Sequence, residues 1–328
     1  MTTLMDPSGR KVDYLRVSVT DRCNERCLYC MPKDFHDWLP REDILSYEEL
    51  LEIVHITSSL GISRYRITGG EPLIRRGIED FIKEMIQIPG VEHVALTTNG
   101  TRLAHLAESL YEGGLRKLNV SLDAIEPKIY NSLTGGRLDE VIDGLEYAQT
   151  LGFSIKLNTV LMRGKNEDQI MPLLDFAQEH GYILRFIELM PVSMTEMLDD
   201  SNFFPINEAK KMIERQESLD VLEHQPSFGF GPARYYSLPK RGIRVGFIGA
   251  MSDFHFCDRC NKMRLTCEGT LRPCLGNHMA SDLKPSLRPK LDRQKLTQIF
   301  QETLAMKPDE HVFRDNYQPD RIMTSIGG

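Results

Sequence analysis

The feature that most constrains the fold is a strand-then-helix rhythm along the first 190 residues. Apolar residues alternate with polar ones in short runs, which predicts strands, and apolar residues at helical spacing follow each run. Ser46, followed three residues later by Glu49, predicts a capping box at the start of the first helix. The predicted strands cover residues 14–19, 64–68, 93–98, 117–122, 154–162 and 183–189. This pattern predicts an α/β fold whose parallel sheet is covered by helices, either open or closed into a full or partial barrel.

Three cysteines lie directly after the first predicted strand: Cys23, Cys27 and Cys30. Their spacing allows one loop to bring three thiolates to a common metal centre. Three ligands are one fewer than a closed zinc site or a fully ligated four-iron cluster takes, so an iron of a cluster would stay open for a small molecule. A zinc site completed by a histidine such as His36 is the alternative, because short cysteine motifs serve both metals.

The composition limits the partners and the compartment. The chain has 328 residues and a net charge of −7, which argues against a general binder of nucleic acid or of a membrane surface. Seven cysteines, six of them in two groups, favour metal binding over disulfides. The N-terminus lacks the apolar core of a signal peptide, and no apolar run reaches membrane-spanning length. We therefore expect a cytoplasmic protein, in which a few local Arg and Lys side chains would meet any anionic ligand.

Residues suited to ligand binding follow the predicted strands at their C-terminal ends, where ligands gather in folds of this class. Besides the cysteine loop, they are Gly69-Gly70-Glu71-Pro72, Thr97-Thr98-Asn99-Gly100, Ser121, Asp123 and Met190. Each could also be an ordinary turn residue. The two glycines have a sharper interpretation, because backbone without side chains can approach a ligand closely.

After about residue 190 the rhythm breaks, so we expect two regions, residues 1–190 and 191–328. The second region carries Cys257, Cys260 and Cys274, again three ligands rather than four. Cys267 or His278 could complete a zinc site, so the spacing alone leaves zinc and iron both open.

A predicted strand at residues 262–267 carries two cations beside the second cysteine group. Period two places Lys262 and Arg264 on one face and Met263, Leu265 and Cys267 on the other. We therefore predict that the two cations point together and that Cys267 is a buried structural cysteine. A solvated strand face is the alternative for the cations.

Taken together, these motifs resemble one enzyme family. Cys-x3-Cys-x2-Cys with Tyr29 before the last cysteine is the signature of the radical S-adenosylmethionine (SAM) enzymes. With Gly-Gly-Glu-Pro, Thr-Thr-Asn-Gly, the second Cys-x2-Cys-x13-Cys group and the terminal Gly-Gly, nearly the whole chain is similar to the GTP 3',8-cyclase family, molybdenum cofactor biosynthesis protein A.

The resemblance implies a partial (β/α)6 TIM-like barrel, the radical SAM core, with a C-terminal region that carries a second iron–sulfur cluster. It implies two [4Fe-4S] clusters, the first held by Cys23, Cys27 and Cys30 and the second by Cys257, Cys260 and Cys274. The positions that match the SAM site of the family are Tyr29, Gly70, Ser121 and Met190. The positions that match its GTP site are Arg16, Arg66, Thr97, Lys156, Lys262, Met263 and Arg264, with Arg185 as a further candidate. The family commonly has arginine where this chain has Lys262.

The resemblance also implies a lyase reaction. A radical formed from SAM would take the C3' hydrogen of the GTP ribose, and C3' would add to guanine C8, giving 3',8-cyclo-7,8-dihydro-GTP in molybdenum cofactor biosynthesis. The Gly-Gly tail would reach into the site.

Several partners follow from the same resemblance. They are GTP, an unidentified reductant protein and, as a candidate, the next enzyme of the pathway, cyclic pyranopterin monophosphate synthase. A monomer and a homodimer are both compatible with the sequence. Two other functions stay open: a different two-cluster radical SAM enzyme that acts on a peptide or small molecule, and a zinc-binding noncatalytic adaptor.

Overall fold

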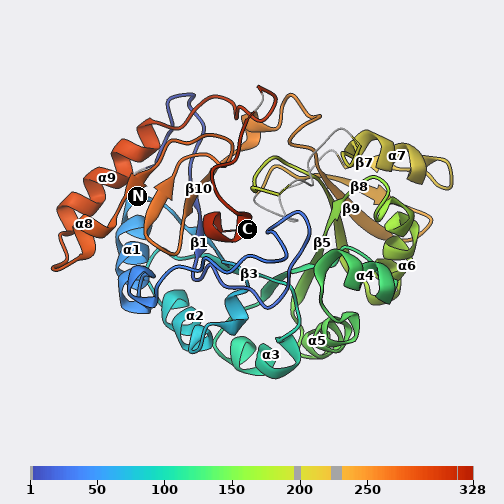
Figure 1. Cartoon of the computed structure of the whole chain (residues 1–328), viewed down its shortest axis with the longest axis horizontal. Helices are drawn as coiled ribbons and strands as arrows, with labels where there is room; N and C mark the ends of the chain where they lie inside the picture. The colour runs from blue at the N-terminus through green and yellow to red at the C-terminus, as the bar shows by residue number, and fades with distance from the viewer. Residues whose placement is uncertain (1–2, 196–200, 223–230, 316, 328) are drawn as a thin grey trace.

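The protein is built on one sheet, in which twelve described strands follow the order β12-β11-β10-β1-β2-β3-β4-β5-β6-β9-β8-β7 (Figure 1). The structure is a computed structural model that describes residues 3–195, 201–222, 231–315 and 317–327. Parallel strands form the centre: β1 (Tyr14–Ser18), β2 (Arg64–Thr68), β3 (His93–Thr98), β4 (Lys117–Ser121), β5 (Ser154–Leu161) and β6 (Ile183–Glu188). They are the predicted strands, each ending within one residue of its predicted end, and they confirm the α/β fold.

Helices form an arc outside these strands in Figure 1. They are α1 (Tyr47–Leu60), α2 (Ile78–Ile86), α3 (Leu103–Glu112), α4 (Pro127–Thr134), α5 (Leu138–Thr150) and α6 (Ile170–His180). The predicted capping box starts α1, because the Ser46 side chain accepts from the Glu49 amide and the Glu49 carboxylate accepts from the Ser46 amide. None of the described helices is both long and apolar enough to span a membrane.

The region after residue 190 extends both edges of the same sheet. On one edge, β9 (Ile243–Ile248) pairs in parallel with β6, and β8 (Arg234–Leu238) and β7 (Asp220–Val221) follow antiparallel. On the other, β10 (Lys262–Leu265) pairs in parallel with β1, followed by β11 (Thr270–Arg272) and β12 (Ser281–Asp282). Among the described strands β7 and β12 do not pair with each other, so the barrel is open.

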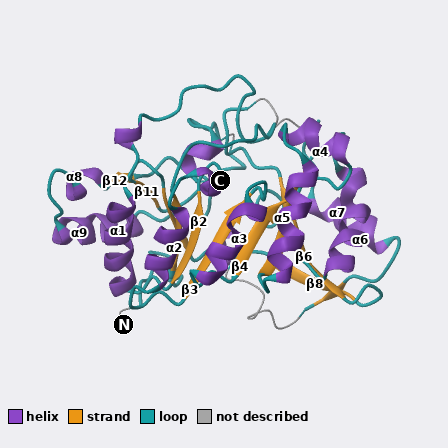
Figure 2. Cartoon of the chain, turned by 90° about the horizontal axis from the view of Figure 1, so that it is seen from below, coloured by secondary structure: helices purple, strands orange, loops and turns teal. Residues whose placement is uncertain are grey.

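Three more described helices belong to this region: α7 (Ile206–Glu214), α8 (Lys284–Leu287) and α9 (Arg293–Ala305). Figure 2 shows α8 and α9 beside α1, and α9 packs against α1. The helix α9, from late in the chain, therefore lies against α1, the first helix of the barrel, on its outside.

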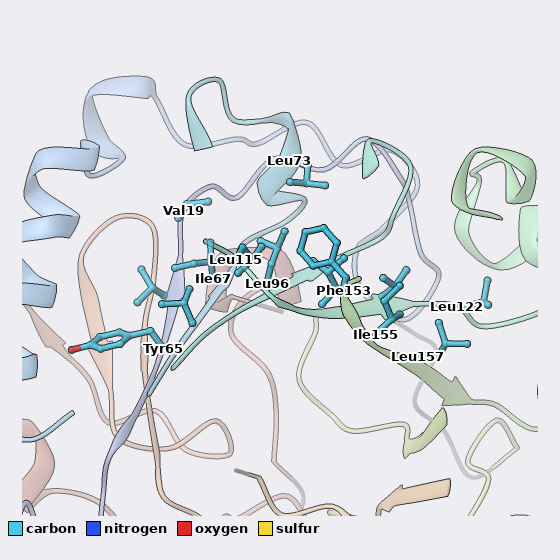
Figure 3. Packing of buried hydrophobic residues seen from close by; sticks show 14 of the residues in the cluster. Val19, Tyr65, Ile67, Leu73, Leu96, Leu115, Leu122, Phe153, Ile155 and Leu157 are labelled. Atoms are coloured by element: carbon cyan, nitrogen blue, oxygen red, sulfur yellow. The ribbon is translucent and has the colours of Figure 1, made fainter. Parts of the chain in front are cut away.

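The main core fills the space between the strands and the helices. Tyr65, Ile67, Leu96 and Leu157 are buried there, and Figure 3 shows them on the central strands β2, β3 and β5. Because successive side chains of a strand point to opposite faces, the alternate positions face the barrel interior. Those interior positions carry the polar and charged residues of the candidate site.

Candidate active site

Both cysteine groups line one cavity at the C-terminal ends of the central strands. Most of the site residues predicted from the sequence line this cavity: Arg16, Cys23, Cys27, Tyr29, Cys30, Gly70, Thr97, Ser121, Met190, Cys257, Cys260, Lys262, Arg264 and Cys274. Cys23 and Cys274, which are 251 positions apart in the sequence, thus face a common space.

The first cysteine loop is fastened to the end of α4. The amides of Arg26 and Leu28 donate to the carbonyls of Thr134 and Leu133, at 2.7 and 2.9 Å. Within the loop, the Cys30 amide donates to the Cys27 carbonyl at 2.9 Å. These hydrogen bonds fix the backbone that carries the three thiols.

The two glycines after β2 let this loop pass close by. A Cβ at Gly70 would overlap the Arg22 carbonyl, and one at Gly69 would lie 2.6 Å from the Thr20 carbonyl oxygen. The Gly70 amide donates to that Thr20 oxygen at 2.7 Å. The glycines are thus needed for contact with the cysteine loop, in addition to the cavity wall that Gly70 forms.

Three buried carboxylates surround the first cysteine group. Glu71 accepts from Thr98 Oγ1 at 2.7 Å and from the Asn99 amide at 2.6 Å, which ties the end of β2 to the end of β3. Glu25 accepts from Tyr130 at 2.7 Å. Burial raises the pKa of Glu25 and of Glu71 to about 7 and that of Asp123 to about 6.

The proposed SAM residues lie beside this acidic group. The Tyr29 hydroxyl donates to Asp123 Oδ2 at 2.8 Å, and Asp123 Oδ1 accepts from the Val160 amide at 2.8 Å. Ser121 ends β4, and Met190 follows β6. The ends of β2, β3, β4, β5 and β6 and the cysteine loop thus contribute to one side of the cavity.

The second cysteine group is built from two chain segments. A short turn holds Cys257 and Cys260, whose amide donates to the Cys257 carbonyl at 2.9 Å, and Cys274 follows β11. Burial alone would raise the pKa of the Cys260 thiol, but the ammonium groups of Lys307 and Lys262 lower it. A cationic surrounding therefore favours the thiolate of Cys260, the form that binds metals.

The residues offered for a zinc site lie elsewhere. Cys267 is fully buried, as predicted for a structural cysteine. His278 stacks on Tyr317 with ring centroids 4.8 Å apart, and His36 is exposed. None of these is among the described residues that line the cavity. Within the described ranges, no three His, Cys, Asp or Glu side chains meet closely enough for a single metal ion.

A row of three arginines crosses neighbouring strands inside the barrel. In the strand register Arg264 of β10 is opposite Arg16 of β1, and Arg16 is opposite Arg66 of β2. Like charges placed side by side on a sheet are destabilising. Burial, followed by the charge of Arg264, lowers the pKa of Arg16, and burial lowers that of Arg264 to about 10. The row is thus arranged for an anionic ligand rather than for stability.

Lysines and a further arginine extend this cationic group. Lys262 shares the inward face of β10 with Arg264, as the alternation predicted, and its Nζ lies 5.3 Å from the centre of the Tyr14 ring. Arg66 Nε donates to the Tyr14 hydroxyl at 2.5 Å. Burial, then the charges of Arg185 and Arg66, lower the pKa of Lys156 to about 7.

Four proposed GTP residues differ in how they meet the cavity. Arg66 reaches Thr97, which lines it, with Nη1 3.4 Å from Thr97 Oγ1. Lys156 and Arg185 are not among the described lining residues, and Arg185 lies close enough to Lys156 to lower its pKa. Met263 is fully buried in the main core on the opposite face of β10, so its side chain points away from the cavity.

The C-terminal tail lines the cavity beside the first cysteine group. The Met323 amide donates to the Cys30 carbonyl at 3.1 Å, and Arg16 Nη2 donates to the Gly327 carbonyl at 3.1 Å. Gly327 has φ +84°, and a Cβ there would lie 3.2 Å from Ser18 Cβ, so this position favours glycine. Gly328, the other half of the terminal pair, lies outside the described residues.

Comparison with known proteins agrees with this arrangement. The Radical SAM superfamily model matches residues 17–177, and the Molybdenum Cofactor Synthesis C model matches residues 182–313. A GTP 3',8-cyclase of Pelotomaculum thermopropionicum is 40% identical over 99% of this chain and 100% of its own length. The chain belongs to the GTP 3',8-cyclase family. The cyclase of Petrotoga mobilis is 38% identical over 99% of this chain and 100% of its own length.

Two solved structures share the fold of this GTP 3',8-cyclase family member. Streptococcus suis SuiB bound to S-adenosylmethionine has a TM-score of 0.62 and 16% identity, and the match spans 84% of this chain and 64% of SuiB. Native anSMEcpe with bound AdoMet has a TM-score of 0.60 and 15% identity, with 92% of this chain and 82% of that chain covered. Membership of the radical SAM superfamily implies SAM and a [4Fe-4S] cluster as cofactors.

Sequence reasoning missed several residues that organise the site in this cyclase family member. The Glu25–Tyr130 bond, the contacts of the tail with Cys30, and the ammonium of Lys307 beside Cys260 were not anticipated. Glu25 lies inside the first cysteine motif, and a carboxylate there could have been noticed. Lys307 gives no local signal, because its partners are 34 to 47 residues away in the chain.

Proposed function

We propose that the protein is a GTP 3',8-cyclase, which converts GTP into 3',8-cyclo-7,8-dihydro-GTP in the first step of molybdenum cofactor biosynthesis. The observation that carries the proposal is a cavity with two groups of three cysteines, lined also by Arg16 and Arg264 from the arginine row. The full-length similarity to GTP 3',8-cyclases supports the same substrate.

Cys23, Cys27 and Cys30 would hold the first [4Fe-4S] cluster. Their thiols face the cavity, and the Glu25 amide already donates to Cys23 Sγ at 3.4 Å, a bond of the kind that tunes cluster potentials. When bound, this cluster and SAM supply a 5'-deoxyadenosyl radical after one-electron reduction. Tyr29, Gly70, Ser121 and Met190 would then seat SAM, which carries a positive sulfonium and suits the nearby carboxylates.

Cys257, Cys260 and Cys274 would hold a second [4Fe-4S] cluster with an open iron for the guanine of GTP. GTP carries about four negative charges, which need local cations in an acidic protein. The cations would come from Arg16, Arg66, Lys156, Lys262 and Arg264. Arg185 lies near Lys156, and Thr97 would add a polar contact. Met263 would contribute through its backbone, because its side chain is in the core.

The residues of the chain would contribute to the reaction by positioning the two ligands. The ribose C3' hydrogen has to lie against the radical carbon, between the SAM side and the cationic side of one cavity. The inserted tail, with Thr324 and Ile326 buried, covers the first cysteine group and helps to exclude water from the reacting carbon.

An anaerobic incubation of iron-reconstituted protein with SAM, GTP and a strong reductant tests the proposal. We expect 5'-deoxyadenosine together with a product of the same mass as GTP, both lost in Cys30→Ala. Cys267→Ala is the matched control, because this buried cysteine lies outside both groups and should leave product formation intact. Formation of 5'-deoxyadenosine without regard to GTP would favour a radical SAM enzyme with another substrate.

A further inference from the structure

Lys307 is a buried lysine that lies between the two arms of the second cysteine group. Lys307 is only 3% exposed, and such burial is rare for a lysine unless its charged group has partners. The Nζ atom donates to three acceptors: Cys260 Sγ at 3.5 Å, the Lys262 carbonyl at 2.8 Å and the Pro273 carbonyl at 2.7 Å. All three donors of the ammonium thus have a partner.

These acceptors come from both arms of the site. Cys260 and Lys262 belong to the arm that leads into β10, whereas Pro273 directly precedes Cys274. One ammonium therefore fixes the distance between the two segments that would share a cluster.

The rest of the fold places this ammonium firmly. Lys307 follows α9, and its amide donates to the Leu304 carbonyl at 3.0 Å. Next in the chain, the carbonyls of Pro308 and Asp309 accept from the guanidinium of Arg10, which also donates to the Cys257 carbonyl at 3.0 Å. The segment 307–309 thus braces the site on both sides, through Arg10 at Cys257 and through Lys307 at Cys260.

We propose that Lys307 is a positioning residue for the second cysteine group, where its ammonium aligns the two arms and, by its charge and its hydrogen bond to Cys260 Sγ, makes the cluster bound there easier to reduce. The inference rests on the proposed function, because it requires a second cluster. Hydrogen bonds to cluster sulfurs and nearby charge are the means by which a protein sets a cluster's potential. A cation stabilises the more negative, reduced state.

The test compares Lys307→Met, which removes the charge at similar length, with Lys295→Met, an exposed lysine on α9, as the matched control. Iron content and an anaerobic redox titration followed by electron paramagnetic resonance are measured after reconstitution. We expect about eight iron atoms per chain in the wild type and in the control. In Lys307→Met we expect either loss of about four of them or a second cluster with a more negative potential, with the first cluster unchanged.

Three results would overturn the inference, each for a separate reason. Wild-type iron content and potentials in Lys307→Met would show that the ammonium does not act on the second cluster. Equal loss of both clusters, with a lowered melting temperature, would show that Lys307 only supports the fold. About four iron atoms in the wild type itself would instead refute the second cluster of the proposed function.

Discussion

The two cysteine groups face the same cavity but lie in opposite electrostatic surroundings. Burial, together with the charges of Glu71 and Glu25, raises the pKa of Cys23 to about 12. At Cys260 the neighbours are cations, Lys307 and Lys262, which lower the pKa against the effect of burial. One side of the cavity thus suits a cationic ligand and the other an anionic one.

This difference in charge explains how one cavity could bind two charged ligands, each on its own side. SAM carries a sulfonium and an ammonium against one carboxylate, whereas GTP is a polyanion. Each would be attracted to its own side and repelled from the other, so the charge pattern orients both without a separate domain for either.

The largest expected effect is at the arginine row. Arg264→Ala should lower GTP turnover by on the order of a hundredfold or more, because a buried charge that meets a phosphate is lost. Lys262→Arg is the matched control and should stay within a few-fold, because the charge is kept. Steady-state assays of product formation measure both, and equal, negligible effects would remove this face from the substrate site.

On the acidic side, Asp123→Asn should weaken SAM binding by roughly tenfold while GTP binding stays the same. The Tyr29 hydroxyl would lose a charged acceptor, and such bonds contribute about 1.5–3 kcal/mol. Equilibrium binding of each ligand to reconstituted protein measures the change, with exposed Asp143→Asn on α5 as the control. A matching loss of GTP affinity would contradict separate sides.

The pH dependence of GTP affinity should follow the titration of the Lys156 ammonium. Its pKa is lowered to about 7, so above pH 7 the free protein has lost this charge and GTP must restore it by proton uptake. Affinity should therefore fall as pH rises from 7.5 to 8.5, by up to about tenfold per unit.

Arginine at this position stays protonated, so Lys156→Arg should flatten the dependence. The pKa of Lys262 is lowered by burial as well, so the comparison is made in the Lys262→Arg background. An unchanged slope in Lys156→Arg would assign the proton to another group.

The smallest effect concerns the stability of the protein without nucleotide. Inorganic triphosphate should raise the melting temperature by on the order of 5 °C near saturation, because it relieves repulsion among the buried cations. Sodium chloride at equal ionic strength should not. The shift should shrink in Arg66→Ala, and persistence of the full shift there would place triphosphate outside the row.

The sequence predicted most where its signals are local. Alternation gave the ends of the central strands and the shared face of Lys262 and Arg264, and the pair Ser46 and Glu49 gave the start of α1. These features depend on neighbours within a few residues, so pattern alone contains them.

Contacts between distant segments could not be predicted in the same way. The pairing of β10 with β1 joins Lys262 to Tyr14, and nothing near either residue encodes the other. The Gly70 backbone was expected to approach a ligand, and the structure adds the Arg22 carbonyl as the atom that needs the space. The bond from Met323 to Cys30 likewise depends on the folded barrel.

The most direct test of the central claim follows one hydrogen atom. GTP that carries deuterium at C3' is incubated anaerobically with SAM, reductant and the reconstituted protein, and the mass of the 5'-deoxyadenosine is measured. The proposed geometry predicts that deuterium moves from C3' into 5'-deoxyadenosine while the cyclised nucleotide forms. Cyclised product accompanied by unlabelled 5'-deoxyadenosine would contradict the claim that this cavity holds C3' against the radical carbon.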